Sequence, residues 1–413
     1  MTNHVITGKQ TQSIFIMFWL GSIVVSGINP ETKQDTWVSI LLASVLILPL
    51  MALYVRIIHL YPGLNLFDIL FKVFGRIFGR ILSLLIIFYA IHLGSMVIKV
   101  SSEFIDIVNM PETPELLTIV FITLFSIWSV KSGAENIGRL AKFTYLILLV
   151  SIALTFIIGL KDMKLDNLKP VMQTDFKSLL SAAYTLDTLP LGEMVLILVF
   201  FSSVSAKASA SKIYVKSLIS MTILYLVVTL RNVMILGVPT ALIVDFPSYS
   251  SVSVISVGDF FSRVEVLTGI NLILAGFIKG SVCLYAASVG LTKVLSIQNQ
   301  KSTVVPCALL IATLSGMVFS NSTDMLEFVK VLRIYVIPFQ IIIPLMIWIG
   351  AEIQTKMNSS KPGSSETPAQ DGDAESQTSE NQDDKSEDTE SKEAKSKKTK
   401  SKNADSLIKE TSN

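Results

Sequence analysis

Two ionisable residues stand in stretches of the sequence that are otherwise apolar. Glu193 directly follows a Pro-Leu-Gly sequence at positions 190–192, and Lys279 lies beside Gly280 in a long hydrophobic run. A carboxylate in such a place could pair with a ligand amine, exchange a proton, or accept hydrogen bonds from its own interrupted helix. A lysine could be the counter-charge to Glu193, could take the place of a bound metal cation, or could extend along its helix to polar surroundings.

Other polar residues in apolar runs have simpler interpretations. Tyr89 and Leu93 are four residues apart, so they share one helix face and could either line a cavity or pack in the core. Arg231 lies near one end of its apolar run, and we expect its side chain to extend to the interface. We expect Arg263 and Glu265 to form a structural ion pair.

The sequence lacks the patterns of common catalytic sites. It contains no glycine-rich nucleotide loop ending in lysine, no HExxH and no GxSxG. The chain has three histidines, and its two cysteines, Cys283 and Cys307, both lie in apolar runs, which is typical of small core residues. We therefore expect no catalytic residues, no metal site and no cofactor, and an enzyme is the class that the sequence favours least.

The composition indicates an integral membrane protein. Hydrophobic residues make up 51% of the chain and charged residues 16%, against roughly 25% charged in a soluble domain. A membrane-spanning helix needs roughly 20 mostly apolar residues. The candidate spans are Thr11–Ile28, Trp37–Leu60, Gly79–Val100, Leu116–Val130, Leu140–Leu160, Leu186–Val204, Ser217–Val238, Val266–Leu291, Thr303–Phe319 and Ile334–Ile353. We expect an all-α polytopic membrane protein of about ten transmembrane helices.

Two of these spans contain residues that interrupt helices. The first span has Gly21-Ser22 and Ser26-Gly27 before Asn29-Pro30, and the sixth has Pro190–Glu193. Paired breaks at corresponding positions in two halves indicate an inverted repeat of the transporter kind. Unwound backbone in a membrane needs partners from a ligand, water or neighbouring protein, whereas glycines that allow close helix packing are the alternative. The matching positions favour a five-plus-five inverted repeat with broken helices one and six, and a binding site at the breaks.

The end of the chain has a different character. Residues 361–413 contain 9 Lys, 13 Asp and Glu, and no aromatic residue, so they cannot bury enough apolar surface to fold alone. We expect a membrane domain over residues 1–356 and a disordered, charged tail over residues 357–413. Lysine and arginine are concentrated in the loops after the second, fourth, sixth and eighth spans, which predicts that both termini are cytoplasmic.

Several segments, in order along residues 8–356, resemble segments of one known family. They are Asp35-Thr36-Trp37-Val38 in the first loop, Asn167-Leu168-Lys169-Pro170-Val171-Met172 in an outer loop, Leu191-Gly192-Glu193 at the break in the sixth span, and Arg263-x-Glu265 at the start of the eighth. No single segment is specific, but the ordered set is. It resembles the permease-like B subunits of the nutrient germinant receptors of bacterial spores.

The resemblance implies an inverted-repeat fold of the amino acid–polyamine–organocation superfamily, located in the spore inner membrane. It implies partners: an A subunit in the membrane, a lipoprotein C subunit, a small germinant that is often an amino acid, and the lipid bilayer, with no nucleic acid. Carried over by position, the ligand-binding residues are Gly21, Ser22, Tyr89, Leu93, Leu191, Gly192, Glu193 and Lys279. Small residues at the breaks would leave backbone free to meet the ligand, and a helix N-terminus there would favour a carboxylate.

Two other functions share this fold. An amino-acid transporter coupled to protons or sodium has the same architecture, so the fold does not separate it from a receptor. A scaffold that binds no ligand and only holds other subunits is the third possibility. A receptor requires a ligand that binds two states of the helix bundle with different affinity.

Overall fold

The computed structural model describes residues 5–23, 27–108, 112–255, 264–319 and 322–359, and this part of the chain is helical apart from one isolated β-bridge between Ile6 and Val204. Of the predicted tail, residues 357–413, the first three belong to the last helix and the remainder lies outside the described residues. The elements are α1 Gly8–Ile23, η1 Lys33–Asp35, α2 Thr36–Leu46, α3 Leu48–Leu60, α4 Leu66–Val108, α5 Glu115–Lys131, α6 Ala134–Gly159, η2 Leu165–Leu168, α7 Phe176–Thr188, η3 Leu191–Ser203, α8 Ala210–Ile243, α9 Pro247–Ser253, α10 Glu265–Val294, α11 Lys301–Ser315, α12 Ser322–Tyr335, η5 Pro338–Ile342 and α13 Ile343–Ser359.

The helices match the predicted spans. Seven helical stretches of the described residues are long and apolar enough to cross a membrane. Three shorter apolar helices, α1, α5 and α11, have 16, 17 and 15 residues and coincide with the predicted first, fourth and ninth spans. The all-α polytopic fold of about ten membrane helices is therefore confirmed.

The first span is interrupted where the sequence predicts. Helix α1 ends at Ile23, directly after Gly21 and Ser22, and residues 27–32 form non-helical turns before η1. Gly27 and Pro30 both disfavour helix continuation. The predicted span to Ile28 is thus longer than the helix, because residues 27 and 28 are not helical.

The third span is longer than predicted. Helix α4 contains 43 residues and includes a non-helical backbone position at Gly75, whose φ is 72°. Glycine adopts this left-handed conformation without steric cost, so the chain bends there between an amphipathic stretch and the long membrane helix. The predicted span, Gly79–Val100, is the central part of that membrane helix.

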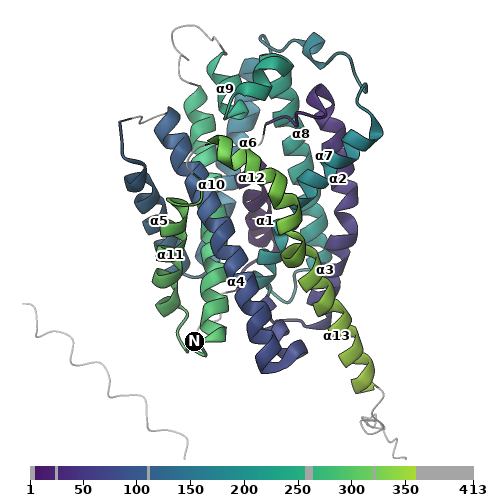
Figure 1. Cartoon of the computed structure of the whole chain (residues 1–413), viewed down its shortest axis with the longest axis vertical. Coiled ribbons are helices and arrows are strands. Elements are labelled where there is room, and N and C mark those ends of the chain that lie inside the picture. Colours follow the sequence, from purple (N-terminus) through teal and green to yellow (C-terminus); the bar gives the residue numbers. More distant parts are fainter. Residues whose placement is uncertain (1–4, 24–26, 109–111, 256–263, 320–321, 360–413) are drawn as a thin grey trace, which may run out of the picture. The chain divides into compact units, whose positions relative to one another are not determined.

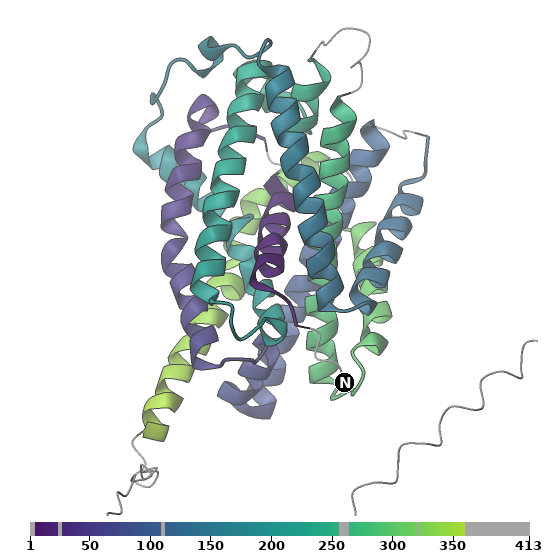
Figure 2. The ribbon, with the colours of Figure 1, turned by 180° about the vertical axis from the view of Figure 1, so that it is seen from behind.

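The interrupted elements lie in the interior of the bundle. Helix α1, the dark purple ribbon, is central in both views (Figure 1 and Figure 2) and packs against α6, α8 and α10. Every residue of η3 from Leu191 to Phe201 is buried. Because neighbouring helices cover α1 and η3, irregular backbone in these elements can find protein partners at membrane depth.

Asp35 connects two segments that are far apart in the sequence. Its buried carboxylate accepts hydrogen bonds from the backbone N–H groups of Met172 at 2.8 Å, Gln173 at 3.0 Å and Thr174 at 3.1 Å, and from the Thr174 hydroxyl at 2.9 Å. Gln34 Nε2 also donates to the carbonyl of Pro170 at 2.8 Å. The loop before α7 is therefore held to the start of α2 by one carboxylate that accepts four hydrogen bonds.

We expect Asp35→Asn to weaken this anchor, because an amide offers one acceptor oxygen and directs a donor toward N–H groups. The loss is about 1–3 kcal/mol, measured as a lower Tm of the purified protein in detergent. Asp166→Asn is the matched control, since Asp166 makes an exposed pair with Lys169 at 2.8 Å and such pairs contribute little. A wild-type Tm for Asp35→Asn would contradict the anchoring role.

Candidate ligand site

The sixth span is broken between two helices of different type. Helix α7 begins at its N-cap, where the Asp175 carboxylate accepts from Ser178 N at 3.0 Å, and it ends at Thr188. After Leu189 and Pro190 the chain continues as the 3₁₀ helix η3. A 3₁₀ helix of 13 residues is unusual, because its hydrogen-bond geometry is poorer than that of an α-helix and such runs are normally short. The break predicted at Pro190–Glu193 is therefore confirmed.

Side chains from other elements satisfy the backbone that the break exposes. The Thr188 carbonyl accepts from Gln340 Nε2 at 2.9 Å, and the Leu191 carbonyl accepts from Trp19 Nε1 at 3.2 Å. Gln340 belongs to η5, a short π-helix that starts at Pro338. Protein side chains thus supply the hydrogen bonds to these carbonyls that lipid hydrocarbon cannot supply.

Glu193 and Lys279 form an ion pair at the centre of the bundle. Lys279 Nζ contacts Glu193 Oε2 and also donates to Ser22 Oγ, and both charged side chains are completely buried. The ammonium lies 5.1 Å from the centre of the Phe18 ring, a cation–π distance. The counter-charge interpretation of Lys279 is correct, and the side chain does not extend to an interface. Glu193 Oε1 has no hydrogen-bond partner.

The two glycines of the predicted site are closely packed against protein atoms. A Cβ at Gly21 would lie 2.9 Å from Lys279 Cβ and 3.0 Å from the Ala275 carbonyl oxygen. A Cβ at Gly192 would collide with the Gln340 amide and lie 2.8 Å from the Asp187 carbonyl oxygen. Both positions therefore require glycine for close approach, and in this structure their backbone meets side chains and helices of the same chain.

Tyr89 joins the site through Gln340. Gln340 Nε2 donates to the Tyr89 hydroxyl at 2.8 Å, and the Tyr89 ring stacks on Phe339 with centroids 4.9 Å apart. Tyr54 donates to the Gln340 carbonyl at 2.7 Å. Leu93 is buried in the same hydrophobic core, one turn further along α4. Gln340 was not among the predicted site residues. The available signal was a single glutamine two residues after a proline in an apolar span.

Arg231 corrects a further expectation. Its side chain does not extend to an interface, because the residue is only 2% exposed and donates to Thr155 Oγ1 at 2.8 Å. The proposed pair of Arg263 with Glu265 cannot be followed, since Arg263 lies outside the described residues.

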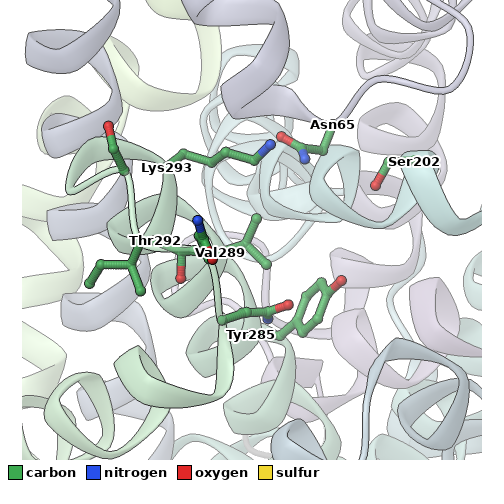
Figure 3. Close-up of a pocket in the computed structure, with 10 residues that line it drawn as sticks. Asn65, Ser202, Tyr285, Val289, Thr292 and Lys293 are labelled. Carbon is green, nitrogen blue, oxygen red and sulfur yellow. The ribbon is translucent and has the colours of Figure 1, made fainter. Parts of the chain in front are cut away.

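A cavity among the described residues lies away from the ion pair. A space of about 510 Å³ lies at the end of the bundle where α10 finishes and is lined by Asn65, Ser202, Tyr285, Val289, Thr292, Lys293, Ser296, Ile297, Gln298 and Gln300 (Figure 3). At this end Lys293 pairs with Asp68 at 2.6 Å. The Glu193–Lys279 pair is thus enclosed in this structure, and a ligand could reach it only after helices move.

Solved structures with a similar fold include a transporter. A nucleobase-cation-symport-1 family transporter, MHP1, in a closed conformation with bromovinylhydantoin bound, matches with a TM-score of 0.63 and 12% identity, covering 84% of this chain and 78% of that one. MhsT in complex with L-phenylalanine matches with a TM-score of 0.52 and 14% identity, covering 83% and 96%. The fold, with its two interrupted spans, is that of a multi-pass transporter-like membrane protein.

The sequence comparisons place the chain more narrowly. The family model described as spore germination protein matches residues 5–325. Spore germination protein KB of Bacillus subtilis (strain 168) is 28% identical over 363 residues, covering 86% of this chain and 96% of the relative. Spore germination protein YndE of the same strain is 24% identical, covering 70% and 81%. The chain belongs to the spore germination protein family of permease-like membrane proteins.

Removing one member of the central pair should be costly. Glu193→Gln or Lys279→Met alone leaves a buried charge without its partner, and we expect each to cost about 3–5 kcal/mol. The double variant carries neither charge and should recover most of that loss. A double-mutant cycle on the Tm of the purified variants measures the coupling.

Arg56→Gln is the control for this cycle. Arg56 pairs with Glu352 at 2.7 Å on an exposed surface, where an ion pair contributes little, so its Tm should equal that of the wild type. Losses that simply add in the Glu193→Gln/Lys279→Met double variant would contradict the central pairing.

Proposed function

We propose that this chain is the membrane subunit of a spore nutrient germinant receptor, which binds an amino-acid germinant at the Glu193–Lys279 pair and thereby triggers germination. The observation that carries the proposal is this buried pair, which lies where both interrupted spans meet. The proposed contact residues are Gly21, Ser22, Tyr89, Leu93, Leu191, Gly192, Glu193 and Lys279.

An amino acid carries the same two charges as the pair. Its ammonium group can replace Lys279 beside Glu193, whose Oε1 is already a free acceptor, while its carboxylate pairs with the released lysine. Binding then replaces one internal ion pair by two ion pairs with the ligand. A molecule with only one of the two groups would leave a buried charge unpaired, which is strongly unfavourable.

Replacing the internal ion pair by ligand contacts gives the helix bundle two states. In one state Lys279 contacts Glu193 and Ser22 and holds α10 against α1 and η3. In the other state the ligand separates those side chains, so the helices have to move apart. A ligand with higher affinity for the second state shifts the population toward it, and we propose that the A subunit in the membrane and the lipoprotein C subunit respond to this shift.

One observation favours the alternative of an amino-acid transporter. The 510 Å³ cavity reaches Tyr285, which lies six residues after Lys279 on α10, or about 9 Å along the helix. Such a cavity could be part of a path for a solute. The receptor remains the better account, because the chain belongs to the spore germination protein family. A tethered ammonium at Lys279 allows binding without a coupling ion, but it equally allows ion-independent exchange by a transporter.

We expect spores in which this gene is replaced by Glu193→Gln or Gly192→Trp to lose the response to one amino acid, with at least about a tenfold higher concentration needed for dipicolinate release. Responses to other nutrients should persist. Arg56→Gln is the control and should respond normally. Immunoblots of the spore membrane must show equal amounts of each variant.

The outcomes separate the two functions. Normal germination of the Glu193→Gln spores at wild-type protein levels, with other germinant receptors deleted, would contradict the receptor. Uptake of the labelled amino acid by vesicles that contain this chain alone would instead support the transporter.

We also propose that the chain lies in the spore inner membrane with the basic loops on the cytoplasmic, core-facing side. These loops share one end of the bundle: Lys293 pairs with Asp68, and Ile6 bonds to Ser203 and Ser205. A membrane-impermeant maleimide added from the outside should label Lys169→Cys but not Ser296→Cys. The native Cys283 and Cys307 are buried, so the background is low. The reverse labelling pattern would invert the topology.

A further inference from the structure

A second cluster of buried polar residues lies away from the central pair. It surrounds Arg231 and draws its members from four helices: Ser151 and Thr155 of α6, Asn232 of α8, Ser248 and Ser251 of α9, and Asn271 of α10. Asn271 precedes Lys279 by eight residues on α10, which is about 12 Å along the helix. The cluster is therefore separate from the candidate ligand site.

Among the described residues, Arg231 has only neutral partners. Its guanidinium donates to Thr155 Oγ1 at 2.8 Å, to Asn232 Oδ1 at 3.0 Å and to the Ser248 carbonyl at 3.2 Å. An arginine has five N–H donors, and its Nε has no hydrogen-bond partner here. None of the ion pairs found among the described residues includes Arg231.

A buried cation of this kind is expensive to keep. Charged groups at membrane depth normally pair with an opposite charge, and arginine cannot lose its proton in proteins. Lys99 illustrates the usual solution in this molecule, since its nearly buried ammonium pairs with Glu115 at 2.6 Å. Arg231 offers the N–H donors of such a pair, but no carboxylate in the described ranges pairs with it.

The cluster also contains an acceptor without a donor. Asn271 Nδ2 donates to Ser151 Oγ at 2.7 Å, whereas Asn271 Oδ1 has no partner. Ser151 and Thr155 are one turn apart on α6, so Asn271 and Arg231 contact neighbouring positions on the same face of that helix. The end of α8 beyond Arg231 meets the loop that contains η2, because Asn167 Nδ2 donates to the Met234 carbonyl at 2.9 Å.

We propose that Arg231 is the centre of a binding site for a monovalent anion, either an inorganic halide or the carboxylate of a small organic molecule. The anion would accept from Arg231 Nε and neutralise the buried charge. With an amino acid, the ammonium group would in addition donate to Asn271 Oδ1. This site does not depend on the proposed receptor function, since a transporter with the same fold would have it too.

The test uses the full chain, purified in detergent with sodium gluconate as a bulky background anion at constant ionic strength. Chloride, acetate or L-alanine then replaces part of the gluconate while the Tm is recorded. We expect at least one of these three probes to raise the Tm saturably, by about 2–4 °C when it exceeds its Kd tenfold. Chloride alone indicates a halide site; acetate indicates a carboxylate site; a larger effect of L-alanine than of acetate indicates that Asn271 takes part.

Variants separate this site from general salt effects. Arg231→Gln should abolish the response to the effective anion, and Lys99→Gln, which removes a cation that already has its carboxylate, should keep it. Thr155→Asp supplies a carboxylate directly to the guanidinium, so it should raise the Tm in gluconate and abolish the response. This variant keeps the test decisive if Arg231→Gln does not fold. A Tm that no probe changes, or a response that persists in Thr155→Asp, would overturn the anion site.

Discussion

The contact between Glu193 and Lys279 places the strongest demand on the rest of the molecule. Two charges without access to water are tolerated when they pair with each other. Lys279 meets this demand through Glu193, Ser22 and the ring of Phe18. These contacts require that α1 ends beside α10 and that the sixth span is interrupted just before Glu193, so the breaks and the ion pair depend on each other.

The same rule, that buried polar groups must be satisfied, explains the structure around this centre. Gln340 and Trp19 take up the carbonyls that the break in the sixth span leaves free, and Asp35 takes up the N–H groups of an irregular loop. Arg231 departs from this rule, because its Nε has no hydrogen-bond partner among the described residues.

Much of this arrangement could be predicted from sequence, because length and hydrophobicity are local properties. Apolar runs gave the spans, and Pro190, Gly192 and Gly21 gave the two breaks. The partners of Lys279 depend on helix packing, so the sequence left three interpretations open. Three features could not be predicted, because they depend on contacts between distant segments. They are the hydrogen bonds of Gln340, the hydrogen bond between Lys279 and Ser22, and the 3₁₀ conformation of η3. For the same reason the prediction for the Arg231 side chain was wrong. A position near the end of a span does not reveal whether neighbouring helices bury the residue.

In the proposed mechanism, Glu193 and Lys279 pair with each other in the absence of ligand and with the two charges of an amino acid in its presence. The most direct measurement is equilibrium binding of labelled amino acids to the purified chain in lipid nanodiscs, with competition by analogues that lack either the carboxylate or the amine. The account predicts saturable binding of one amino acid, no competition by either analogue, and loss of binding in Lys279→Met. Binding that survives Lys279→Met unchanged, or that an amine alone displaces fully, would contradict it.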